Sequence, residues 1–217
     1  GLGTPPSLRR VGARAEVRQS RVGLGTPPSL RRVGARAEVR GKEAAEKPAG
    51  KVVVIGASSY VGRQILSALK KTRSGAIGTA YQNLHPGLEF LDVNDELAIK
   101  EFIESTQPDV IIYAAAEARP DRAEADPERA AALNVTAVQS IEKYFKGRLI
   151  YLSTDYVFDG QKPPYAPDTP PHPLNVYGKT KMEGERVVLA RPENAVMRLG
   201  IVFGEEGDPE KNFLRQI

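Results

Sequence analysis

The alternation of short apolar runs with segments of helical period predicts an α/β protein with a doubly wound parallel sheet, the Rossmann type. Runs such as 51–56 and 109–116 are almost continuously apolar. Such strands are typical of parallel sheets, which are buried on both faces. Strict β-α-β alternation with right-handed crossovers then gives a doubly wound sheet.

The apolar runs and the periodic segments give the elements in order. The expected strands are KVVVIG (51–56), AIGTAY (76–81), EFLDV (89–93), DVIIYAAA (109–116), RLIYLST (148–154) and NAVMRLGIVF (194–203). A first helix follows residue 56, with Val61, Ile65, Leu66 and Leu69 on one face. Further helices are expected over about 95–106, 127–145 and 175–190.

Composition excludes several classes of function. The 217 residues are enough for one sizeable domain plus a tail. There is no cysteine, and the two histidines are isolated, so we expect no disulfide and no metal site. No apolar run approaches the roughly 18 residues of a membrane helix, and we expect a soluble protein that does not bind membranes.

The positive charge is concentrated in the first 50 residues. They hold nine Arg and two Lys against four Glu, which leaves 20 basic and 23 acidic residues for the rest of the chain. The part expected to fold therefore has no global basic bias, and nucleic acid is not an expected partner.

An 18-residue segment occurs twice near the N-terminus. Residues 1–18 recur without a change at 23–40. Two Arg-, Gly- and Pro-rich copies with almost no large apolar residues cannot offset the entropy of ordering. We predict a disordered tail over 1–48 and a dinucleotide-binding domain over 49–217. The tail resembles an organellar transit peptide, but a translated repetitive sequence or a mis-joined gene model is favoured, with a cytoplasmic location.

The first strand runs directly into a small-residue turn that indicates a pyrophosphate site. Gly56 allows the tight turn, Gly62 lets the following helix pack closely, and backbone N–H groups at the helix start can approach phosphate. The usual extended-reductase motif T-G-x-x-G-x-x-G has Thr at position 55 and Gly at 59, where this chain has Ile55 and Ser59. The hydroxyl of Ser59 could itself bond a phosphate. The expected contacts in the turn are Gly56, Ser58, Ser59, Tyr60, Val61 and Gly62.

The tip of the second strand bears on the choice of dinucleotide. A carboxylate there usually holds the ribose 2′-hydroxyl of NAD. Here the tip carries Tyr81 and Gln82 in place of a carboxylate, which favours NADP. The preference is mild because no Arg is present to hold a 2′-phosphate, and NAD stays possible. Asp92 and Val93, at the end of the third strand, match a residue pair that contacts adenine in extended reductases. Asp92 could equally cap the next helix. The remaining expected contacts are Ala114, Ala115, Ala116 and Val202.

A tyrosine and a lysine four residues apart indicate catalysis. On a helix, Tyr177 and Lys181 lie on one face about one turn apart. A neighbouring ammonium lowers the pKa of a phenol toward the working range of an acid/base catalyst. The sequence Ser153-Thr154-Asp155 ends the fifth strand, where doubly wound sheets bind ligands, so a hydroxyl there could bond a carbonyl oxygen. Asn134 could hold a water that relays to Lys181, or could be a solvent-facing helix residue.

Three stretches carry a resemblance to a known family. The sequences STDYVFDG (153–160), PPY (163–165) and PLNVYGKTKMEGE (173–185) closely resemble the dTDP-4-dehydrorhamnose reductase family. That family belongs to the extended short-chain dehydrogenases/reductases and includes the regulatory beta subunit of methionine adenosyltransferase. The sequences AAEARPD (115–121) and LNV (133–135) look nearer to the beta-subunit branch. The resemblance covers roughly 51–217.

The resemblance implies roles for individual residues. Thr154 would polarise the substrate carbonyl, Tyr177 would donate the proton, Lys181 would bind ribose and tune Tyr177, and Asp155 would support them. The proline-rich loop over 163–173 would border the substrate cleft. Members of the family continue into a C-terminal lobe that binds the nucleotide-sugar, and we expect this lobe to be truncated here.

Three hypotheses for function follow. The first is an NAD(P)H-dependent reductase acting on a ketone of a nucleotide-sugar, ranked slightly ahead on chemistry. The second is an NADP-binding regulatory subunit that docks onto a methionine adenosyltransferase catalytic subunit, in S-adenosylmethionine biosynthesis. The third is a truncated product without independent function. A homodimer is possible in each case.

Overall fold

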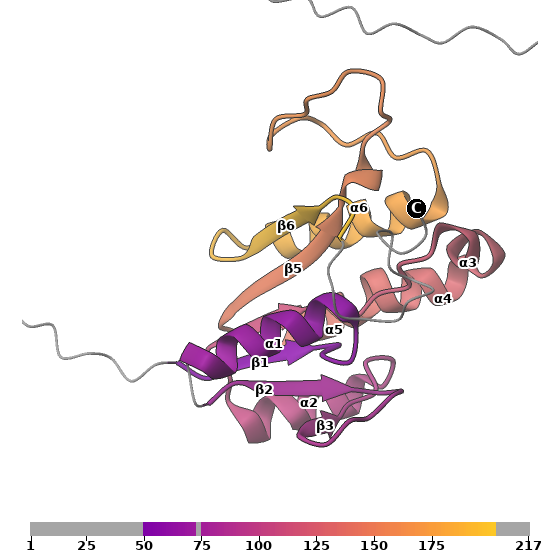
Figure 1. The fold of residues 1–217 in the computed structure, drawn as a ribbon. Coiled ribbons are helices and arrows are strands. Elements are labelled where there is room, and N and C mark those ends of the chain that lie inside the picture. Colours follow the sequence, from indigo (N-terminus) through magenta and orange to yellow (C-terminus); the bar gives the residue numbers. More distant parts are fainter. Residues whose placement is uncertain (1–49, 73–74, 203–217) are drawn as a thin grey trace, which may run out of the picture. The chain divides into compact units, whose positions relative to one another are not determined.

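Six parallel strands form one sheet in the order β3-β2-β1-β4-β5-β6 in the computed structural model, which describes residues 50–72 and 75–202. The strands are β1 (Val52–Ile55), β2 (Ile77–Ala80), β3 (Leu88–Phe90), β4 (Val110–Tyr113), β5 (Arg148–Thr154) and β6 (Ala195–Leu199). The first strand, β1, lies inside the sheet, with β2 and then β3 on one side of it. The next strands, β4, β5 and β6, follow in order on its other side (Figure 1). The predicted doubly wound parallel sheet is therefore confirmed.

Helices connect most of the strands. They are α1 (Tyr60–Thr72), α2 (Glu96–Thr106), α3 (Pro120–Ala125), α4 (Pro127–Ala131), α5 (Ala137–Tyr144) and α6 (Val176–Leu189). A π-helical turn, η1 (Ala132–Thr136), joins α4 to α5, and a 3₁₀ turn, η2 (Asp155–Val157), follows β5. The helix expected over 127–145 is thus present but contains a π turn, while α3 was not expected.

Five of the six expected strands are shorter than their apolar runs. The third, expected over 89–93, ends at Phe90, the fourth, expected to reach 116, ends at Tyr113, and the sixth, expected to reach 203, ends at Leu199. Beyond β6, Ile201 and Val202 are exposed. The third run continues past the last paired residue because apolar side chains are also buried outside strands. Leu91 and Val93, for example, are core residues just beyond β3. The predictions made for residues 1–48 fall outside the described residues.

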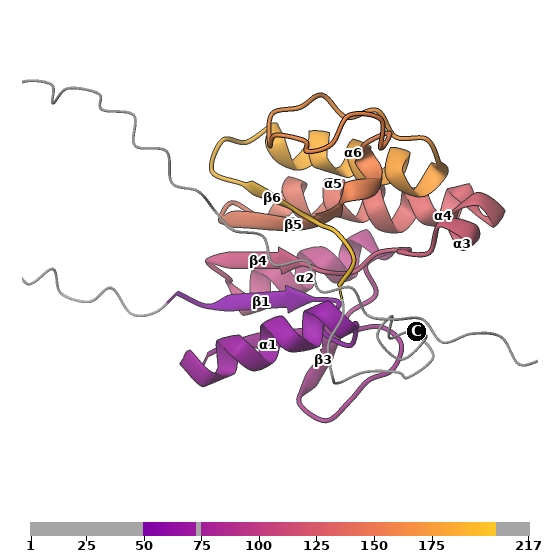
Figure 2. The same cartoon turned by 45° about the horizontal axis from the view of Figure 1, so that its top comes forward.

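The two faces of the sheet are covered by different helices. Val53 and Ile55 of β1 belong to a core that α2, α5 and α6 complete through Ile99, Ile141 and Val188. The alternate residue Val54 packs on the other face against Leu66 of α1. Figure 2 shows α1 on one side of the sheet and the α5–α6 pair on the other. Strand residues on both faces are therefore buried, as the continuous apolar runs indicated.

Side chains of known capping type begin several of the helices, and two of them bear on the site. Asp95 accepts hydrogen bonds from the backbone N–H groups of Leu97 and Ala98 at the start of α2. Asn175 accepts one from Gly178 at 2.7 Å at the start of α6. These caps satisfy backbone donors that a helix leaves free, and the cap of α6 fixes where Tyr177 enters the helix. None of the helices in the described part of the chain is long and apolar enough to cross a membrane.

Candidate active site and cofactor site

The turn after β1 is built around Gly56. Its φ of +83° lies in the region that favours glycine, and a Cβ there would stand 2.5 Å from the backbone nitrogen of Ala115. A Cβ on Gly62 would collide with the carbonyl oxygen of Gly56. Both glycines are therefore required by close backbone contacts, which bring β1, the start of α1 and the end of β4 together at one crevice.

The two serines of the turn have different partners. Ser59 Oγ accepts a hydrogen bond of 3.0 Å from the backbone N–H of Gly62, so this side chain caps α1. Its own proton remains available to an acceptor. Ser58 Oγ donates to the carbonyl oxygen of Gln82 at 3.3 Å and so ties the turn to the tip of β2. The serine in place of the middle glycine thus has a structural role that the sequence did not predict.

The tip of β2 presents exposed side chains. The ring of Tyr81 is about half exposed and lies 5.8 Å from the ring of Phe90, centroid to centroid. Gln82 is exposed as well and offers its backbone carbonyl to Ser58. No carboxylate occurs at this tip, so the observation behind the preference for NADP holds in the structure.

Asp92 and Val93 lie just past β3. Asp92 Oδ1 accepts hydrogen bonds from both the backbone and the side chain of Asn94, at 2.9 and 3.0 Å. The alternative that Asp92 caps α2 is wrong, because Asp95 is the cap. Val93 is buried in the core below α2, so only its backbone faces the crevice side.

The end of β4 is lined by small side chains. Ala114, Ala115 and Ala116 are half-buried and follow the strand directly, and the N–H of Ala114 donates to Ile55 at 2.8 Å. Val202 lies beyond β6 and is 44% exposed. The alanines therefore share the crevice with Gly56, whereas no contact in the structure joins Val202 to it among the described residues.

Two hydroxyls meet where β5 ends and α6 begins. Thr154 is buried at the end of β5, and its side chain lies close enough to that of Tyr177 to affect the pKa of the tyrosine. Thr154 Oγ1 also donates to Asp155 Oδ1 at 3.1 Å. Burial raises the pKa of Tyr177, with a smaller increase from Asp155 and an opposing effect of Thr154. The expectation of a lowered pKa is therefore wrong for this structure, because burial outweighs any stabilisation of the phenolate.

Lys181 lies one helical turn after Tyr177 and is 1% exposed. Its ammonium donates to the carbonyl oxygen of Leu152 at 2.6 Å and stands 3.9 Å from the centroid of the Tyr151 ring. Burial lowers the pKa of Lys181 to about 7, against a smaller opposing effect of Glu185. The lysine is thus held against β5 rather than presented to solvent, which explains why it does not lower the pKa of Tyr177.

Asn134 sits in the π turn and is fully buried, so the solvent-facing alternative is wrong. Its side chain bonds the backbone of Glu117 and donates to Thr180 Oγ1 at 3.0 Å. Its carbonyl oxygen accepts a hydrogen bond from Tyr151 at 2.9 Å. Asn134 therefore connects the loop after β4 to α6, and its polar groups already have protein partners.

The sequence analysis did not predict an ionic cluster that lies behind the hydroxyls of Thr154 and Tyr177. Glu185 accepts a hydrogen bond from Ser153 at 2.6 Å and two from Arg198, at 2.9 and 2.7 Å. The guanidinium also bonds the carbonyl of Pro167 and lies 5.0 Å from the Phe158 ring. The sequence did contain a signal for this cluster, because Arg198 lies in the middle of an apolar strand run. A charge in such a place requires a partner of opposite charge.

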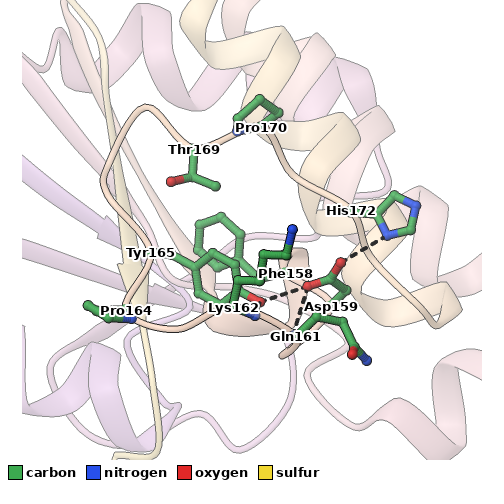
Figure 3. A pocket seen from close by; sticks show the side chains of 9 residues that line it. All are labelled: Phe158, Asp159, Gln161, Lys162, Pro164, Tyr165, Thr169, Pro170 and His172. Carbon is green, nitrogen blue, oxygen red and sulfur yellow. Dashed lines mark hydrogen bonds and ion pairs between the residues drawn. The ribbon is translucent and has the colours of Figure 1, made fainter.

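Arg198 thus reaches the loop over 158–172, which extends beyond η2 (Figure 1). Phe158 and Tyr165 stack in parallel there at 4.2 Å. As Figure 3 shows, Asp159 accepts a hydrogen bond from Tyr165 at 2.7 Å and pairs with His172 Nδ1 at 3.4 Å. These contacts enclose a cavity of about 270 Å³ within the loop. The proline-rich segment is therefore ordered by its own side chains.

The fold and this arrangement define a class, the Rossmann-type domain of the extended short-chain dehydrogenases/reductases. The chain belongs to the family described as the RmlD substrate binding domain, whose family model matches residues 50–217. Among the described residues, no group of three or more His, Asp or Glu side chains is placed so that it could hold a metal ion.

Two kinds of curated relative match the chain. Methionine adenosyltransferase 2 subunit beta of Xenopus laevis is 43% identical over 162 residues, which cover 73% of this chain and 48% of the relative. A dTDP-4-dehydrorhamnose reductase of Aggregatibacter actinomycetemcomitans is 34% identical over 170 residues, covering 76% and 55%. The chain spans about half the length of the curated relatives it matches. The predicted resemblance to both branches is confirmed.

Solved structures agree with this family. A hypothetical dTDP-4-dehydrorhamnose reductase from Sulfolobus tokodaii has a TM-score of 0.68 and 34% identity, covering 74% of this chain and 59% of its own. A dTDP-4-dehydrorhamnose reductase from Bacillus anthracis, solved in complex with NADP, also has a TM-score of 0.68, with 25% identity over 77% and 58%.

Proposed function

We propose that this chain forms the dinucleotide-binding part of an NAD(P)H-dependent reductase of the dTDP-4-dehydrorhamnose reductase type. The observation that carries the proposal is that the hydroxyls of Thr154 and Tyr177, both largely buried, lie together at the carboxyl edge of the sheet. Ligands of doubly wound sheets bind at this edge. A ketone oxygen placed between the two hydroxyls would receive two hydrogen bonds.

The crevice beside Gly56 fits a dinucleotide. A Cβ at this position would fill the space between β1 and the end of β4, and the half-buried alanines after β4 leave the backbone accessible. The start of α1 directs its N–H groups toward the same place. Gly56, Ser58, Ser59, Tyr60, Val61 and Gly62 would hold the pyrophosphate, with Tyr81, Gln82 and Asp92 nearer to the adenosine.

The chemistry follows from the protonation of Tyr177. The nicotinamide would supply a hydride to the carbonyl carbon, and a proton must reach the carbonyl oxygen to give the alcohol. Burial raises the pKa of Tyr177, so the hydroxyl is protonated at neutral pH and can donate. Thr154 would orient the oxygen, and solvent would return the proton to Tyr177. Asp155, in contact with Thr154, would hold that hydroxyl in place.

A titration tests the cofactor part of the proposal. NADPH and NADH would be added to the protein separately, with dinucleotide fluorescence as the readout. We expect binding of both and tighter binding of NADPH, because the tip of β2 has no carboxylate for the ribose 2′-hydroxyl. Absence of binding would reject a dinucleotide site, while equal or tighter binding of NADH would reject only the preference.

A second function is supported by the stronger sequence similarity to the beta-subunit branch. The identity of 43% with a methionine adenosyltransferase subunit exceeds the 34% with a reductase. In this alternative the chain binds NADP and docks onto a methionine adenosyltransferase catalytic subunit. Size-exclusion chromatography of the protein mixed with such a subunit, run beside an assay of dTDP-4-dehydrorhamnose reduction, separates the two functions. A stable complex without turnover would favour the regulatory function.

A further inference from the structure

The connection between β2 and β3 is short for parallel strands. β2 ends at Ala80 and β3 begins at Leu88, so residues 81–87 make the whole crossover. Parallel strands are usually joined by a dozen or more residues that include a helix. Because this crossover has none, no second helix packs beside α1 over β2 and β3 in the described part of the chain. A groove of about 490 Å³ occupies the space between α1 and the segment 85–88.

The floor of the groove is apolar. Ala57, Leu66 and Leu88 line it and converge over Gly78 of β2. A Cβ on Gly78 would stand 2.8 Å from both Ala57 and Leu88 and would collide with Leu66. The groove is thus walled by aliphatic side chains at its base, and its volume is within the range of small-molecule sites, roughly 300–1,000 Å³.

The rim of the groove is cationic. Arg63, Lys70 and Lys71 line it from α1, and His85 lines it from the crossover. Lys70 Nζ lies 3.8 Å from the position that a Cβ on Gly87 would occupy, so its ammonium reaches across to the opposite wall. No lining residue is acidic.

These cations have no carboxylate partner among the residues that the structure describes. None of the ion pairs found in that part of the chain includes Arg63, Lys70 or Lys71. The sequence explains why, since no Asp or Glu occurs between residues 47 and 88. The rest of the folded part carries an excess of acidic groups. The groove is therefore a local concentration of positive charge around an apolar floor.

We propose that this groove binds a small amphipathic anion, with an aromatic or aliphatic body on Leu66 and Leu88 and one carboxylate, sulfonate or phosphate at Lys70. Charge complementarity and the apolar floor argue together for such a ligand. The groove follows α1 toward its C-terminal end, whereas the proposed pyrophosphate site lies at its N-terminal end. The inference goes beyond the proposed function and does not depend on it.

Two matched probes test the proposal on the whole protein. The monoanion 2-naphthoate and the neutral 2-naphthamide would be titrated by calorimetry. We expect the naphthoate to bind about tenfold more tightly, because only it pairs with the rim cations. The variant Lys70→Ala/Lys71→Ala should weaken naphthoate binding about tenfold, about 1.4 kcal/mol, and leave naphthamide binding nearly unchanged. Lys146→Ala/Arg148→Ala, which removes two exposed cations at the start of β5, is the control and should change neither.

The position of the ligand is tested separately. Ser67 is exposed on the wall of the groove, and Ser67→Trp should block it and abolish binding of both probes. Failure of naphthoate to bind at millimolar concentration, or unchanged binding to Ser67→Trp, would overturn the proposal. Displacement of naphthoate by NADPH would also overturn it, since the groove would then belong to the dinucleotide site. If naphthoate binds but no dinucleotide does, the proposed function is rejected and the proposal that the groove binds an anion still holds.

Discussion

Two opposing effects determine the pKa of the Tyr177 hydroxyl. Burial favours its protonated form, and the side chain of Thr154 favours its ionised form. Burial is the larger effect, so Tyr177 is a proton donor at neutral pH and a poor base. This protonation state suits the reduction of a ketone, whereas oxidation of an alcohol would require the phenolate.

Tyr177→Phe should therefore separate binding from chemistry. We expect cofactor affinity to change little, because the lost hydroxyl faces Thr154, and turnover to fall by about 10²-fold or more, as for loss of a general acid. Stopped-flow measurement of NADPH oxidation with a ketone substrate checks the rate, and fluorescence titration checks the affinity. Unchanged turnover would show that another group supplies the proton.

Lys181 should make stability depend on pH. Its pKa is about 7 in the folded protein and near the ordinary 10.5 in the unfolded chain. Between these values the unfolded chain binds more protons, so the free energy of unfolding should rise as pH increases from 7. Urea unfolding should give on the order of 2 kcal/mol more stability at about pH 9 than at about pH 7.

The variant Lys181→Met isolates this contribution. It keeps the length of the side chain and removes the titrating group, so the rise in stability between about pH 7 and pH 9 should largely disappear. A rise of the same size in the variant would mean that another group titrates in this range. Cofactor affinity measured on the same protein would show separately whether Lys181 also contacts the ribose.

The sequence predicted the position of the candidate residues in the fold better than it predicted their surroundings. Gly56 follows β1 and Thr154 ends β5, and such strand ends can be predicted from apolar periodicity. The pKa of Tyr177 was mispredicted because it depends on burial and on the direction of the Lys181 ammonium. Both are set by side chains distant in the sequence, such as Tyr151, and no local spacing encodes them.

The position of α6 against its neighbours is determined by close contacts at two glycines. A Cβ on Gly178 would collide with the carbonyl oxygen of Tyr156, and one on Gly184 with that of Asn134. The π turn contributes as well, because the carbonyls of Leu133 and Asn134 accept hydrogen bonds from Tyr113 and Tyr151. The helix was predictable from sequence, but the π turn was not, since its signal is these tertiary hydrogen bonds.

Arg198 should control the order of the loop over 158–172. Arg198→Met would leave the buried carboxylate of Glu185 with Ser153 alone and remove the contacts to Pro167 and Phe158. We expect a loss of roughly 3 kcal/mol in the free energy of unfolding. Cleavage by chymotrypsin after Tyr165, which lies in the loop and is followed by Ala166, should also become faster.

The control is Arg186→Met on α6. Arg186 is exposed and pairs with Glu183 at 4.0 Å, so its removal should cost less than about 1 kcal/mol. Cleavage by chymotrypsin after Tyr165 should not change in this variant. Equal cleavage rates in Arg198→Met and the unaltered protein would show that the stacked rings and Asp159 hold the loop without Arg198.

The whole molecule divides its charge unevenly. Residues 1–50 carry a surplus of basic groups, while the remainder carries a surplus of acidic groups. A long basic segment could attract phosphates of a dinucleotide through its field alone, without any folded contact. An affinity measured on the whole chain therefore combines the crevice at Gly56 with this field, and the two contributions differ in their response to salt.

Removal of residues 1–48 separates these contributions. The segment has almost no large apolar residues, so the sequence predicts that it adds little to the stability of the domain. We expect the shortened protein to melt within a few degrees of the whole chain. NADPH affinity at about 0.15 M salt should also be the same, because exposed charges are screened beyond about 8 Å. At low salt the whole chain should bind NADPH more tightly than the shortened protein. A large drop in melting temperature would show instead that the repeated segment packs on the domain.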